Sequence, residues 1–131
     1  MKFLLMMGMK AQPSEPGQGI GSWPQEDIRA HIAFMHAFNA ELKAAGEYVA
    51  AEGLAWPAEA RVVRAGEGGE PVISSDFEPS KEFLMGFWIV HVQGAERAFE
   101  LAARVSAAPG RGGRPLNMPI EVRQIPSGPP A

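Results

Sequence analysis

The chain has 131 residues, the usual size of a single domain, and is long enough to bury a core. Its formal net charge is −3, with acidic and basic residues interspersed, which argues against a protein that binds nucleic acid directly. Cysteine is absent, which excludes disulfides and thiolate metal sites and is compatible with a cytoplasmic protein.

The first residues, MKFLLMMGMK, form an apolar run that predicts a β-strand. Residues 3–7 are apolar on both alternating faces, as is typical of a strand that is covered on both sides. The run is much shorter than the roughly 20 apolar residues that cross a bilayer, and no small-residue cleavage site follows it. We therefore expect neither a signal peptide nor a membrane segment.

A loop rich in glycine and proline is expected over residues 11–25, followed by a helix over 26–45. Glu26 and Asp27 suit the first turn of this helix, and Gly46 follows where a C-terminal cap belongs. Apolar side chains recur at three- and four-residue steps and predict one buried stripe: Ile28, Ile32, Met35, Phe38 and Leu42.

Three short strands and a longer one are expected next. Residues 48–51 are a short strand, and 60–64 and 70–74 flank AGEGG as the two strands of a hairpin. Residues 87–92, dense in aromatic and β-branched side chains, predict the central strand most strongly.

The last third of the chain predicts a helix, a loop and a strand. The helix is traced by apolar residues at helical spacing: Ala95, Ala98, Phe99, Ala102 and Val105. The loop APGRGGRP then leads to a strand over residues 120–125. The tail, residues 126–131, is expected to be disordered, so the domain covers residues 1–125.

This order of elements predicts a ferredoxin-like α+β domain, an antiparallel sheet with two helices on one face. Two helices cover only one face of such a sheet, yet the first and central strands are apolar on both faces. A bare apolar sheet face is a large hydrophobic patch, which soluble monomers rarely tolerate. We therefore expect a homodimer in which the two sheets face each other.

Five segments, in this order and spacing, resemble the YCII-related family, in particular its DGPF-domain branch: FNAELKAAG (38–46), AAEGLAWPAEARVVR (50–64), DFEPSKEFLMGFWIVHV (76–92), AERAFELAAR (95–104) and IEVRQI (120–125). The resemblance implies a ferredoxin-like fold that forms a dimeric α/β barrel. It also implies a cleft with a His/Asp pair, for which an enzymatic role has been suggested, and a link to extracytoplasmic-function sigma factors.

The sequence departs from the family pattern at this pair. The Asp-Gly-Pro-Phe motif falls on residues 74–77, so that Ser74 occupies the aspartate position and Asp76 comes two places later. The histidine that the resemblance implies in the first helix falls on Met35, and His36 is its neighbour. The catalytic assignment therefore does not carry over.

His91 and Asp76 remain the candidates for catalysis. His91 shares a strand face with Phe87 and Ile89, so we expect it to be at least partly buried. It is either a general base in a cleft or a strand-end histidine bonded to the backbone. Asp76 either pairs with His91 or holds a turn through an Asx hydrogen bond.

The other candidate residues are proposed to line a ligand cleft: Ser74, Trp88, His31 and Trp56. His31 lies within the apolar stripe of the first helix and is otherwise a satisfied core or rim histidine, whereas His36 is expected to face solvent. These two histidines do not have the i, i+4 spacing of a helical zinc site. We expect no metal and no cofactor.

Two functions follow as hypotheses. The first is binding of a small molecule in a cleft near the dimer interface, with acid/base chemistry by His91 and Asp76 as its extension. The second is a non-catalytic interaction module tied to transcription through a sigma factor.

Overall fold

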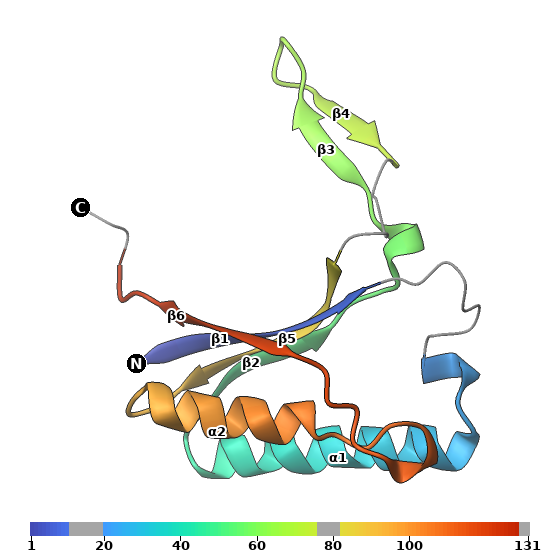
Figure 1. Ribbon diagram of the computed structural model, residues 1–131. Helices are drawn as coiled ribbons and strands as arrows, with labels where there is room; N and C mark the ends of the chain where they lie inside the picture. Colours follow the sequence, from blue (N-terminus) through green and yellow to red (C-terminus); the bar gives the residue numbers. More distant parts are fainter. Residues whose placement is uncertain (11–19, 76–81, 129–131) are drawn as a thin grey trace.

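The computed structural model describes residues 1–10, 20–75 and 82–128. Its main sheet has the order β2-β5-β1-β6, and every neighbouring pair is antiparallel. The helices α1 and α2 lie side by side on one face of this sheet (Figure 1). The strands and helices are β1 (Lys2–Lys10), α1 (Gln25–Ala44), β2 (Tyr48–Gly53), β3 (Val62–Ala65), β4 (Pro71–Ser74), β5 (Glu82–His91), α2 (Ala95–Ser106) and β6 (Ile120–Ile125). The predicted ferredoxin-like fold is thus confirmed.

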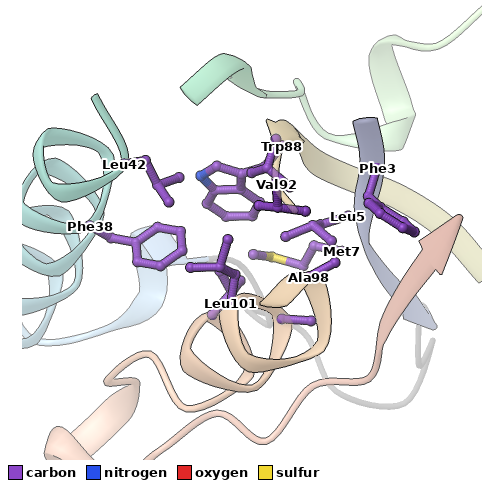
Figure 2. Packing of buried hydrophobic residues seen from close by; sticks show 12 residues of the cluster. Phe3, Leu5, Met7, Phe38, Leu42, Trp88, Val92, Ala98 and Leu101 are labelled. Atoms are coloured by element: carbon purple, nitrogen blue, oxygen red, sulfur yellow. The ribbon is translucent and has the colours of Figure 1, made fainter. Parts of the chain in front are cut away.

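The core lies between the sheet and the two helices. Alternation along the strands turns Leu5 of β1 and Trp88 and Val90 of β5 toward the helices, where all three are buried. Phe38 and Leu42 point from α1 toward Trp88, and Leu101 closes the cluster from α2 (Figure 2). The rings of Phe38 and Trp88 meet edge to face, with centroids 6.0 Å apart.

The helix stripes differ from the expectation at three residues: Phe99 and Ile32 are exposed, and Leu101, which was not predicted, is buried. In α2 the buried residues are Ala98, Leu101, Ala102 and Val105. Phe99, predicted to be part of this stripe, is 56% exposed because it lies about 100° further round the helix than Ala98. In α1, Ile32 is 45% exposed because it also lies to one side of the buried stripe of its helix. The buried residues of α1 are Phe38 and Leu42.

The observed bounds of the elements agree best with the predicted ones at the end of the chain, and least in the central strand. β6 has the predicted limits, whereas β5 starts at Glu82, five residues before the expected start at Phe87. The added residues pair with the far end of β1, a long-range contact that local composition does not reveal. Of the expected loop and tail, residues 11–19 and 129–131 lie outside the described residues.

The second face of the sheet, which we call the outer face, has no helix over it among the described residues. Register and alternation place Leu4, Met6, Phe87 and Ile89 there, and each is half-buried in a single chain. An antiparallel sheet with one face in water normally alternates apolar and polar side chains, and these strands do not. The observation that motivated the homodimer therefore persists in the fold; the homodimer itself stays a prediction.

The strands β3 and β4 form a hairpin that projects away from the main sheet (Figure 1). Val63 and Ile73 are directly opposite each other on one face, and they are 58% and 65% exposed. A two-stranded hairpin with no packed face is only marginally stable in water. The hairpin is thus a second apolar surface, separate from the outer face.

Glu47 and Arg97 join the start of β2 to the first turns of α2. Arg97 donates from Nε to Oε2 and from Nη2 to Oε1 of Glu47, both at 2.9 Å. The hydrogen bonds from Arg97 lower the pKa of the Glu47 carboxyl below its usual value. The Glu47 side chain is 14% exposed and that of Arg97 is 39% exposed, so solvent screens the pair only in part.

Replacing Glu47 by glutamine is expected to lower the free energy of unfolding by about 1 kcal/mol at neutral pH. Because the folded-state pKa of Glu47 is lowered, its contribution is present above the ordinary value of 4.5 and is lost as the pH falls through the lowered value. The difference between wild type and variant, measured by urea denaturation from pH 7 to 3, should therefore shrink in acid. Glu100→Gln, at an exposed carboxylate that also binds Arg97, is the control with the smaller effect. A difference that does not change with pH would contradict this role.

Candidate functional site

A cavity of about 670 Å³ lies between α1 and the main sheet, and we call it the helix–sheet cavity. This volume is within the range of sites for small organic molecules. The cavity is on the side of the sheet that faces the helices, opposite the outer face. Its walls come from α1, β2, β5, the second half of β1 and the segment before β6, so the fold assembles it from distant parts of the chain.

Aromatic and thioether side chains make up most of this wall. All three tryptophans of the chain, Trp23, Trp56 and Trp88, line the cavity. Four methionines join them: Met7, Met35, Met85 and Met118. Such a wall favours apolar ligands with aromatic rings, because large flat side chains offer both area and stacking contacts.

The polar groups of the cavity are concentrated on one row of α1. His31, Met35 and Asn39 are spaced four residues apart, which puts them on one face of the helix. His31 Nδ1 lies 3.0 Å from the carbonyl oxygen of Pro109, and the Trp88 indole N–H donates to Asn39 Oδ1 at 2.9 Å. The edge of Trp23 packs against His31, with ring centroids 5.5 Å apart. Both polar side chains are therefore held in place before any ligand arrives.

A bulge and two glycines shape the sheet side of the cavity. The register between β1 and β5 shifts between Met7 and Gly8, and the extra residue, Met85, lines the cavity. At Gly86 an added Cβ would come within 2.9 Å of the backbone oxygen of Glu52, so only glycine allows β2 to approach β5 there. At Gly53 an added Cβ would meet nothing, which leaves open space at the wall.

The structure brings three of the candidate residues together. His31, Trp56 and Trp88 line the helix–sheet cavity, and Trp56 also packs edge to face against Phe83. Ser74 ends β4 in the hairpin and does not line the cavity. Asp76 lies outside the described residues. That these residues bind a ligand stays a prediction.

His91, the first candidate for catalysis, is exposed in the single chain, and its expected burial, which requires a second copy over this face, stays a prediction. Its backbone N–H donates to the Glu47 carbonyl at 2.8 Å. Alternation puts the imidazole on the outer face, since Val90 and Val92 are buried on the other side. His91 thus shares this face with Phe87 and Ile89, as predicted. His91 therefore takes no part in the helix–sheet cavity.

Several cavity residues were not singled out by the sequence as site residues, among them Trp23, Asn39, Met85 and Gly53. The four-residue spacing of His31, Met35 and Asn39 was a usable signal, because it marks one helix face that combines apolar and polar groups. No comparable signal existed for Met85, whose side chain reaches the cavity only through the bulge. His36, expected to face solvent, is exposed.

Within residues 1–10, 20–75 and 82–128, no three histidine, aspartate or glutamate side chains gather as a metal site would require. No helix in that part of the chain is both long and apolar enough to cross a membrane. A family model described as the YCII-related domain matches residues 1–111, which covers the chain from β1 to η3 (Arg111–Gly113) and leaves out β6. No curated protein is similar enough to match the chain.

Proposed function

The chain belongs to the YCII-related domain family, and we propose that it binds a small, mainly apolar molecule in the helix–sheet cavity. The observation that carries this proposal is the gathering of all three tryptophans around one cavity with two oriented polar groups, His31 and Asn39. A cavity that served only as a packing defect would have no reason to collect so much aromatic surface. Apolar walls with few placed polar groups are the usual composition of ligand sites.

Acid/base chemistry on the bound molecule would proceed through His31. Of the described residues that line the cavity, only His31 and Glu52 have side chains of the kinds that serve as general acids or bases. His31 sits on the rigid helix α1 and is fixed by Pro109, whereas Glu52 is exposed on β2. This proposal differs from the one with His91 and Asp76: His91 does not line this cavity, and Asp76 lies outside the described residues.

The experiment is a titration with N-phenyl-1-naphthylamine, an uncharged dye, followed by tryptophan emission and by dye fluorescence. We expect one saturable site per chain, with the tryptophan signal changing because all three indoles line the cavity. Gly53→Leu should weaken binding at least tenfold, since its side chain enters open space at the cavity wall while the fold has room for it.

Val49→Leu, an exposed position on the same strand that does not line the cavity, is the matched control and should leave the affinity unchanged. A dye that binds Gly53→Leu as well as wild type would be bound elsewhere, and the proposed site would be wrong.

We also propose that two copies of the chain pair through their outer faces. Leu4, Met6, Phe87 and Ile89 supply a continuous apolar surface on two neighbouring strands, and a second copy would cover it. The resulting arrangement is the dimeric barrel that the sequence led us to expect. The cavity is on the opposite side of the sheet, so pairing leaves it in place.

A second candidate function, docking of another protein, is favoured by the hairpin. Val63 and Ile73 expose an apolar pair outside the outer face, which is what a non-catalytic interaction module requires. A sigma factor is the partner proposed from the resemblance described above. This candidate predicts that the hairpin is dispensable for the homodimer.

A further inference from the structure

We propose that the ligand of the helix–sheet cavity is an uncharged aromatic hydroxy compound whose O–H donates to Nε2 of His31. This inference rests on the proposed small-molecule function and adds the chemical class of the ligand. Four features support it: the tautomer of His31, the lack of lysine and arginine among the described residues of the wall, the aromatic lining and the size of the cavity.

The hydrogen bond to Pro109 sets the tautomer of His31. A carbonyl oxygen can only accept a hydrogen bond, so the partner at 3.0 Å requires the proton to be on Nδ1. In the neutral imidazole Nε2 then carries a lone pair and accepts. Among the described residues no side chain or backbone group donates to Nε2, and the ring lines the cavity. A ligand bound in the cavity can therefore donate a hydrogen bond to Nε2 of His31.

The charge of the wall excludes the common anionic ligands. No lysine or arginine is among the described residues that line the cavity, and its one charged side chain is Glu52. A phosphate or carboxylate placed there would lose its hydration without gaining a cationic partner. The donor that His31 accepts from therefore belongs to an uncharged ligand, and a hydroxyl group satisfies this condition.

The tryptophans of the wall indicate that the ligand contains aromatic rings. Trp23 packs against His31, and Trp56 and Trp88 face the same space, so the neighbourhood of Nε2 is aromatic. Flat rings gain edge or face contacts with such side chains beyond the area they bury. A volume of about 670 Å³ accommodates a body of two or more fused rings. A hydroxylated aromatic compound has the donor, the neutral charge, the flat rings and the size that this cavity favours.

The test compares three naphthalenes of nearly equal size at pH 8: 2-naphthol, 2-methoxynaphthalene and 2-naphthoate. Wild type is expected to bind 2-naphthol about tenfold more tightly than the more apolar methoxy compound, because only the naphthol has a donor. The naphthoate should bind most weakly. His31→Phe keeps an aromatic ring but no nitrogen, so it should lose the naphthol preference and still bind the methoxy compound.

His36→Phe, an exposed position on the same helix, is the matched control and should keep the wild-type order. Equal affinities of wild type for naphthol and methoxynaphthalene, an unchanged preference in His31→Phe, or tightest binding of the naphthoate would each overturn the inference. If the uncharged dye binds at the cavity while these results appear, the proposed function stands and only the ligand class is wrong. If neither the dye nor any naphthalene binds, both are wrong.

Discussion

Replacing Trp88 by alanine is expected to lower the free energy of unfolding by about 3–5 kcal/mol. The indole is buried between α1 and the sheet, where it packs against Phe38 and donates to Asn39. The variant loses this apolar contact and leaves a hole beside the existing helix–sheet cavity, which the surrounding helices can only partly fill. Since domains of this size are stable by about 5–15 kcal/mol in total, the variant should be close to unfolding.

The measurement is urea denaturation followed by circular dichroism, with Trp88→Phe as the control. Phenylalanine keeps most of the apolar contact and removes the hydrogen bond to Asn39, so it should cost about 1–2 kcal/mol. A loss below about 1 kcal/mol in Trp88→Ala would mean that the indole is not part of the core. The two variants together separate the role of Trp88 in folding from its role as a cavity wall.

Replacing Ile89 by glutamate is expected to convert the proposed homodimer into single chains. Ile89 lies opposite Leu4 in the middle of the outer face. Pairing of two sheets would therefore bury one new carboxylate from each copy, and neither would have a cationic partner. Such burial costs several kcal/mol per charge, which raises the dissociation constant by at least a hundredfold. Sedimentation velocity at micromolar concentration should show a dimer for wild type and a monomer for the variant.

Ile32→Glu is the matched control, because it makes the same substitution at an exposed position of the helix layer and should leave the dimer intact. A monomeric wild type at micromolar concentration would end the proposal that the outer faces pair. A double variant, Val63→Ser with Ile73→Ser, tests the hairpin in the same instrument. It should remain a dimer if the hairpin serves another protein, and it would dissociate if the hairpin holds the second copy.

The sequence predicted the fold where local pattern and long-range pairing agree. β6 and α1 have clear ends, because glycine, proline and acidic residues mark them, and their limits match to within one residue. β5 was underestimated because its first half has no dense apolar run and is defined by pairing with β1. Phe99 was misplaced because the buried stripe of α2 is centred on Ala98 and Val105, and Phe99 lies about 100° further round the helix than Ala98.

The candidate site could be predicted in part only. His31, Trp56 and Trp88 were chosen as cleft residues because large or titratable side chains stand out in a small domain. Their convergence on one cavity depends on how β2, β5 and α1 pack, which no local pattern contains. For His91, the strand face was predicted correctly, but its burial depends on the proposed second copy, about which a local pattern carries no information.

The methionines around the helix–sheet cavity have one more consequence. Met7, Met35, Met85 and Met118 place four oxidisable sulfur atoms in a single wall. Each sulfoxide would put a polar, chiral S=O group where an apolar thioether had been. Exposure to peroxide would thus change the ligand preference of the wall, and methionine sulfoxide reductases would restore it.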